Sequence, residues 1–146
     1  MASDVMRLAG RTALVTGAAS GIGRALAGSL SRRGCHLALV DVDADGLARL
    51  AAALSASGVR LTTHVLDVSD AAAVAALPDR ILAAHRRVDI LVNNAGVALG
   101  GTFEQVSESD FEWLFDVNFW SVVVVGQFQC QLMVDSARSA FEKPTR

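Results

Sequence analysis

The sequence predicts an α/β protein in which helices cover a parallel sheet. Three observations support this prediction. Short apolar runs alternate along the chain with longer segments whose apolar residues have helical spacing. The apolar runs are nearly continuous, which is typical of strands buried on both faces. The first run ends in a glycine-rich turn that opens directly into a helix.

Composition sets the class of protein. The chain has 146 residues, 52% of them hydrophobic, and a net charge of −2, so we expect one soluble domain with its own core. There is no basic run that would indicate nucleic-acid binding and no cysteine spacing that would indicate a metal site. Residues 1–10 lack the apolar core of a signal peptide, and glutamines interrupt the apolar stretch 117–134. We therefore expect no membrane span and a cytoplasmic location.

The first strand and helix frame the glycine-rich turn. We expect a strand over 11–16 and a helix over 21–33, which Gly34 ends. In the turn between them, Gly17 and Gly21 free the backbone for a tight bend and for close approach of an anion. A third glycine, Gly23, would let the helix lie close to the strand. The amide groups at the helix start favour a phosphate, although an ordinary strand-to-helix turn is the alternative.

Asp41 follows the second expected strand, 36–40. It comes 18 residues after Gly23, near the position where dinucleotide folds place an acid for the ribose hydroxyls. A carboxylate there would repel the 2′-phosphate of NADP, and neither Ser20 nor Val42 supplies a positive charge. The sequence therefore favours NAD, with a simple turn residue as the alternative for Asp41.

The middle of the chain repeats the alternation. We expect a helix over 44–56 and a strand over 61–66 in which His64 is structural. Asp67 either contacts adenine or caps the next helix, for which Ser69 is a second candidate cap. The next expected helix spans 70–87.

Two features qualify the helix 70–87. Pro78 should kink or split it. Near its end, His85 beside two arginines indicates a solvated terminus.

A fourth strand, 88–92, leads into Asn93-Asn94-Ala95-Gly96. Amide side chains at a strand's carboxyl end can bind backbone and ribose together. After a loop at Gly100-Gly101, Ser107 and Asp110 have the spacing of a capping box. The helix that follows is expected to run towards Ser139, although the valines 122–125 alone would suit a strand.

Taken in order, these motifs resemble the short-chain dehydrogenase/reductase family over residues 8–125. The motifs are Thr16-Gly17 with Gly21-Ile22-Gly23, then Asp41, Asp67-Val68, Asn93-Asn94-Ala95-Gly96 and Asn118. The resemblance implies a Rossmann-like doubly wound sheet, here with about four strands in the order 3-2-1-4. It also implies hydride transfer between a nicotinamide dinucleotide and an alcohol or carbonyl compound.

The resemblance assigns roles by position. The implied cofactor residues are Gly17, Ser20, Gly21, Ile22 and Gly23 at the pyrophosphate, Asp41 at the ribose, Asp67 and Val68 at the adenine, and Asn94, Ala95 and Gly96 along the cleft. Asn118 matches the family's asparagine that supports a proton relay, and is the one catalytic match. The family's serine and its Tyr-x-x-x-Lys pair are not found. The chain has no tyrosine, and Ser139 stands four residues before Lys143, its one lysine.

These departures divide the chain and leave three functions open. We expect a leader (1–10), a dinucleotide-binding domain (11–133) and a divergent tail (134–146), as in the first half of such an enzyme. The first hypothesis is an NAD-binding protein that is inactive alone. The second is an oxidoreductase completed by another subunit or by residues such as Ser121 or His85. The third is a non-enzymatic interaction module. An uncovered edge at strand four predicts a marginally stable protein that associates with itself or pairs with another chain.

Overall fold

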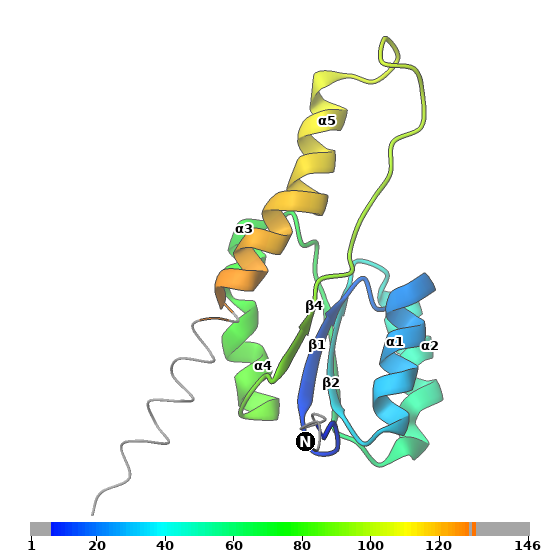
Figure 1. Ribbon diagram of the computed structural model, residues 1–146, viewed down its shortest axis with the longest axis vertical. Helices are drawn as coiled ribbons and strands as arrows, with labels where there is room; N and C mark the ends of the chain where they lie inside the picture. Colours follow the sequence, from blue (N-terminus) through cyan, green and yellow to red (C-terminus); the bar gives the residue numbers. More distant parts are fainter. Residues whose placement is uncertain (1–6, 129, 131–146) are drawn as a thin grey trace, which may run out of the picture.

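The computed structural model describes residues 7–128 and 130. Its centre is a sheet of four parallel strands in the order β3-β2-β1-β4, so the predicted Rossmann-like topology is confirmed (Figure 1). The strands are β1 (Thr12–Thr16), β2 (His36–Asp41), β3 (Leu61–Val65) and β4 (Ile90–Val92). In the central pair, Val15 lies opposite Leu39, and Val15 also lies opposite Val92 on β4. The carboxyl ends of the strands therefore meet at one edge of the sheet.

The two central strands of the sheet are buried on both faces. Side chains alternate along a strand, so Val15 and Leu39 point to the face covered by α1 (Gly21–Arg32) and α2 (Ala44–Leu54). Leu14 and Val40 point to the opposite face and join a second apolar cluster. The continuous apolar runs of β1 and β2 follow from this double burial. A short 3-10 turn, η1 (Ser55–Ser57), extends α2.

The helix expected over 70–87 is divided at its proline. α3 (Ala71–Ala75) and α4 (Leu77–His85) form two pieces, and Pro78 lies in the first turn of the second, where its missing N–H costs nothing. The cap of α3 is Asp70, whose carboxylate accepts hydrogen bonds from the next turn. The expectation that Ser69 or Asp67 caps this helix is therefore wrong.

β4 begins two residues later than expected, and the Asp89 side chain just before it binds the start of β1. Its carboxylate accepts hydrogen bonds from Arg11 Nη1 at 2.8 Å, from Thr12 N at 2.9 Å and from Arg87. Burial raises the pKa of Asp89, but these hydrogen bonds outweigh it and hold the pKa below its ordinary value. Asp89 thus ties the start of β1 to the entry of β4, and the ladder begins at Ile90.

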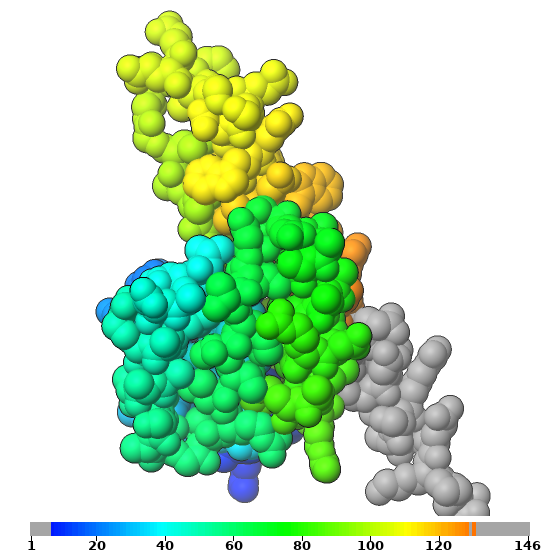
Figure 2. Space-filling model, turned by 180° about the vertical axis from the view of Figure 1, so that it is seen from behind, coloured from blue at the N-terminus to red at the C-terminus, as the bar shows by residue number. Residues whose placement is uncertain are grey.

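The last described segment rises above the carboxyl edge of the sheet (Figures 1 and 2). The connection 97–107 runs outward, and α5 (Glu108–Phe115) returns from a capping box formed by Ser107 and Asp110, as predicted. A π-helical turn, η2 (Asp116–Trp120), leads into a further helix over 121–128, so the valines are helical. We call residues 97–120 the arm. The expected course to Ser139 and the tail 134–146 lie outside the described residues.

Candidate functional site

The glycine-rich turn joins β1 to α1 at the carboxyl edge. Gly17 has φ +63°, and a Cβ there would lie 2.8 Å from Ala95 Cα, so no side chain fits. A Cβ on Gly23 would lie 2.1 Å from Gly17 O, which is the close contact expected between helix and strand. Gly21 differs, because its φ is +49° and a Cβ there would meet nothing within 4 Å. Its open side lies on the cleft described below.

The start of α1 is suited to an anion. Ser20 is the N-cap but its side chain makes no capping hydrogen bond, and the first turn carries no acidic residue. The first amide N–H groups of a helix have no partner within it, and the helix dipole places partial positive charge there. These amide groups are therefore available to a phosphate group.

Thr16 joins the two central loops, a role the sequence analysis did not assign. Its hydroxyl donates to Val92 O at 3.4 Å and accepts from Asn94 N at 3.0 Å and Ala95 N at 3.1 Å. The Asn94 side chain donates in return to Thr16 O at 3.0 Å and Gly17 O at 3.1 Å. The turn after β1 and the loop after β4 are thereby held as one unit. In the sequence, the position of Thr16 directly before Gly17 could have indicated this role.

Asp41 both fixes the turn and lines the cleft. Its Oδ2 accepts from Ala19 N at 2.8 Å, and its Oδ1 accepts from Asp43 N at 3.0 Å. The two interpretations offered for this residue are therefore compatible, because each carboxylate oxygen can accept a further hydrogen bond. Asp67 has a similar local role, since its Oδ1 accepts from Ser69 N at 2.9 Å and Ser69 Oγ at 2.7 Å.

The Asn118 side chain forms hydrogen bonds with the backbone of the arm. Its Oδ1 accepts from Val97 N and its Nδ2 donates to Val97 O, both at 2.8 Å. A Cβ on Gly96 would lie 3.1 Å from Asn118 Oδ1, so the loop passes close to this amide. Asn118 thus fixes the loop that follows β4 onto the helix of the arm.

These loops enclose one cleft of about 520 Å³ at the carboxyl edge. Ten of the eleven expected cofactor residues line it: Gly17, Ser20, Gly21, Ile22, Asp41, Asp67, Val68, Asn94, Ala95 and Gly96. Gly23 lies behind the turn, and Asn118 is not among the lining residues. Five lining residues had not been assigned to the cofactor: Val42, Leu66, Val97, Trp113 and Val117.

Three of the five, Val42, Leu66 and Val97, are sequence neighbours of residues expected at the cleft, and the other two lie on the helix of the arm. Leu66 and Val97 extend motifs that the sequence analysis had already placed at the cleft. Trp113 and Val117 are four residues apart, so they share one face of the helix. That this face turns towards the cleft depends on long-range packing, which helical spacing alone does not reveal.

The histidines lie away from the cleft. His64 is buried and its Nε2 is 2.9 Å from Thr62 Oγ1, which agrees with the structural role expected. The expectation of a solvated His85 is wrong, because its ring is buried and its Nε2 is 2.8 Å from the same hydroxyl. Burial, followed by the positive charge of Arg60 and by His36 and His64, lowers the pKa of His85 to about 4.

Ser121 was the other alternative catalytic residue. Its side chain is buried and its Oγ donates to Val117 O at 2.5 Å. Neither Ser121 nor His85 lines the cleft. Within residues 7–128 and 130, no group of histidine, cysteine and acidic side chains could hold a metal ion, and no helix has the length and apolarity needed to span a bilayer.

Comparison with known proteins identifies the family. The sequence profile of the short chain dehydrogenases matches residues 11–140. The chain belongs to the short-chain dehydrogenase family. Its residues are 39% identical to D-threitol dehydrogenase of Mycolicibacterium smegmatis over 134 residues, which is 92% of this chain and 52% of that protein. The chain spans about half the length of the curated short-chain dehydrogenases and oxidoreductases it matches.

Solved short-chain dehydrogenases share the fold. A Burkholderia phymatum enzyme in complex with NAD superimposes with a TM-score of 0.85 at 38% identity, covering 90% of this chain and 47% of that one. A metagenomic short-chain oxidoreductase in complex with NADP gives a TM-score of 0.83 at 33% identity, covering 90% of this chain and 60% of that one. Both nicotinamide cofactors thus occur among its structural relatives.

Proposed function

We propose that the cleft binds a nicotinamide dinucleotide, with its pyrophosphate at the start of α1. The observation that supports this most directly is the convergence of the loops after all four strands on one cleft, beside a helix start without acidic residues. Ligands of open α/β sheets bind at this edge. The Burkholderia phymatum relative, solved with NAD, has the same fold.

The residues present fit such a cofactor. A dinucleotide needs backbone N–H donors for its phosphates, and the turn at Gly21 leaves open space where any other residue would carry a side chain. The carboxylate of Asp41 lies on the cleft and retains acceptor capacity for ribose hydroxyls. Apolar Val68 and Val42 offer a surface for the flat face of adenine.

We further propose that NAD is preferred over NADP. The 2′-phosphate of NADP would lie near Asp41, where two negative charges would repel each other. The cleft-lining residues include no lysine or arginine that could compensate. Relatives solved with NAD and with NADP share this fold, so the fold alone does not select one cofactor. The negative charge of Asp41 is what supports the preference for NAD.

The family reaction would be hydride transfer between the cofactor and a small alcohol or carbonyl compound, and the bound nicotinamide would supply the hydride chemistry. This chain's residues would bind and orient the cofactor, while Asn118 would hold the loop at Val97 in place. Such chemistry also needs a positioned proton donor, worth typically about 10²–10⁴-fold in rate. The 146 residues contain no tyrosine and hence no Tyr-x-x-x-Lys pair. We therefore propose that the 146-residue chain binds the cofactor but is impaired or inactive alone.

Calorimetry and a turnover assay test the two parts separately. NAD should bind the 146-residue chain, with NADP binding more weakly, whereas a panel of secondary alcohols and ketones should give no turnover above the uncatalysed rate. Absence of NAD uptake at millimolar concentration would favour the interaction module instead. Robust turnover by the pure chain would disprove inactivity and leave the binding site standing.

A further inference from the structure

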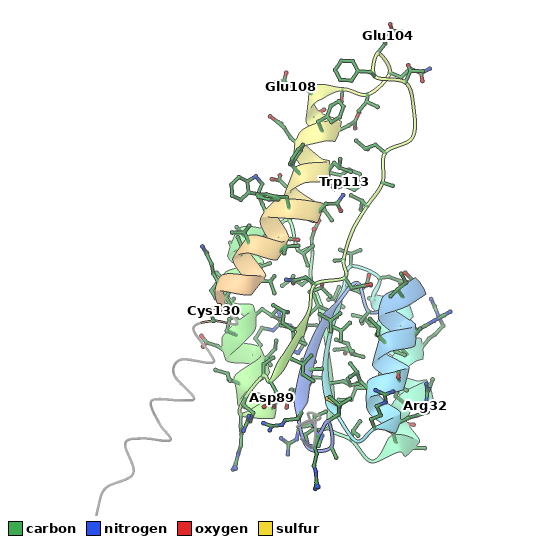
Figure 3. The ribbon with its side chains drawn as sticks, in the orientation of Figure 1. Arg32, Asp89, Glu104, Glu108, Trp113 and Cys130 are labelled. Atoms are coloured by element: carbon green, nitrogen blue, oxygen red, sulfur yellow. The ribbon has the colours of Figure 1, made fainter. Side chains whose placement is uncertain are left out.

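Trp113 is the one aromatic side chain among the described residues that line the cleft. It belongs to α5, and Figure 3 shows it above the carboxyl edge of the sheet. The residue is 42% exposed, so a large part of the indole ring is open to solvent. Tryptophan is usually buried to a greater extent, and a half-exposed ring that borders a cleft offers apolar surface to a ligand.

Trp113 is the outermost member of a helical stripe that otherwise packs in the core. Val117, Ser121 and Val125 follow it at intervals of four residues and are 6%, 5% and 3% exposed. The stripe enters the core at Val117, about one helical turn below Trp113. Because the inner residues are fixed by core packing, the direction of the stripe is set, and Trp113 continues it over the open cleft.

The stripe lies on the side of the helix that faces the loop after β3. Val117 belongs to the same apolar cluster as Leu66 and Val68, which follow that strand. The next residue, Asn118, lies roughly a quarter turn further round the helix and binds the loop after β4 instead. Trp113 is therefore on the side of the helix nearer to the loop after β3.

The loops after β2 and β3 border the part of the cleft that suits adenosine. Asp41 ends β2 and is the proposed partner of the ribose hydroxyls, and Val42 and Val68 offer apolar surface beside it. A purine ring is flat and aromatic on both faces, so an aromatic side chain beside it can act as a stacking partner. Among the described lining residues, Trp113 alone can supply that partner.

We propose that Trp113 stacks on the adenine ring, so that the ADP-ribosyl half of the dinucleotide supplies most of the affinity. This assignment rests on the cofactor binding proposed above and specifies which half of the cofactor the chain recognises. With the pyrophosphate at the start of α1 and the ribose at Asp41, each part of an ADP-ribosyl group has a partner on the described chain. ADP-ribose should therefore bind with an affinity similar to that of NAD.

Calorimetry with NAD, ADP-ribose and AMP tests the assignment, because all three ligands carry adenine. W113A should bind each of them about 5- to 150-fold more weakly than the parent chain, which is the range typical of losing one base–aromatic stack. W113F keeps an aromatic ring and should recover most of the loss. W120A is the matched control. Trp120 is 54% exposed and does not line the cleft, so this variant should bind all three ligands like the parent.

Tryptophan fluorescence gives a second readout that leaves Trp113 in place. The chain has two tryptophans, so W120F reports on Trp113 alone and W113F reports on Trp120 alone. Saturating ADP-ribose should change the emission of W120F and slow its quenching by acrylamide, since the indole becomes covered. The emission of W113F should not respond. This measurement decides the assignment even if W113A folds poorly.

The outcomes separate the role of Trp113 from cofactor binding itself. If W113A binds AMP and ADP-ribose like the parent, the indole does not stack on adenine, and the cofactor site still stands. If W113A loses affinity for NAD alone, the indole contacts the nicotinamide half and the assignment is overturned. A parent chain that binds neither NAD nor ADP-ribose would disprove the cofactor site, and the role of Trp113 with it.

Discussion

At the scale of single residues, Asp41 combines two functions that sequence reasoning kept apart. Its oxygens hold the amides of Ala19 and Asp43 while the same carboxylate borders the cleft. A side chain already fixed by two backbone donors presents its charge in a set position. Binding a cofactor therefore costs little additional conformational entropy in the Asp41 side chain.

Replacing Asp41 with asparagine should shift the cofactor preference. A hydrogen bond to a charged group contributes about 1.5–3 kcal/mol, so NAD should bind roughly ten to a hundredfold more weakly. NADP should improve relative to NAD because the repelling charge is gone. Calorimetric titration of both cofactors measures this change. Asp45→Asn, which removes a nearby charge away from the cleft, is the matched control. Unchanged affinities in Asp41→Asn would leave Asp41 a turn residue only.

Gly21→Val should abolish cofactor binding by placing a side chain where the pyrophosphate is proposed to lie. Gly58 is a close control, since it too has positive φ and a Cβ there would meet nothing within 4 Å. Gly58→Val should carry a similar backbone strain of about 1–3 kcal/mol while leaving NAD affinity unchanged. Calorimetry compared with thermal unfolding separates the two effects. If Gly21→Val binds NAD normally, the turn does not hold the phosphates.

At the scale of elements, the site depends on how β1 and β4 are joined at their carboxyl ends. One hydroxyl, that of Thr16, accepts two backbone N–H groups and donates to Val92 O. The Asn94 amide completes the connection from the other side. The cleft is thus formed by two loops that cannot move independently.

Thr16→Val should loosen this junction while keeping the side-chain shape. Two amides would lose their acceptor at a buried position, so the free energy of unfolding should fall by about 1–3 kcal/mol. Urea unfolding measures the loss, and NAD affinity should fall as well. Thr63→Val, at an exposed position of β3, should change neither quantity. Equal stability of the two variants would contradict the role of the Thr16 hydroxyl.

The elements themselves were largely predictable from local chemistry. Apolar runs identified the four strands, Pro78 indicated the division of the helix, and Ser107 with Asp110 marked the start of α5. His85 was misjudged because the two arginines that follow it in sequence suggested an exposed helix end, whereas in the fold its ring is buried against the Thr62 hydroxyl. The cleft residues contributed by the arm were missed for the same reason, since tertiary packing determines which helix face turns inward.

At the scale of the whole molecule, buried histidines make stability depend on pH. The folded pKa of His85 is about 4, below its ordinary value of 6.5, and burial followed by Arg80 also lowers the pKa of His64. Between these pH values the unfolded chain binds more protons than the folded chain, so the free energy of unfolding should fall as pH drops from 6.5 towards 4.

Urea unfolding across that pH range tests the expectation. His85→Leu should remove most of this slope, although it also removes one of the two histidine rings that contact the Thr62 hydroxyl. The residual slope should belong to His64. A free energy of unfolding that stays flat from pH 6.5 to 4.5 in the parent chain would show that neither ring resists protonation.

The π-helical turn η2 affects how the arm would respond to the loss of one residue. A single π turn inside a longer helix corresponds to one extra residue relative to a regular α-helix. Deleting one residue within Asp116–Trp120 should let the helix close as a regular α-helix. The residues before and after the turn should keep their sides of the helix, because the wide turn had absorbed the extra residue. Trp113 would therefore still face the cleft while Val125 stayed in the core, so this turn is a place where the arm can lose one residue without being reoriented.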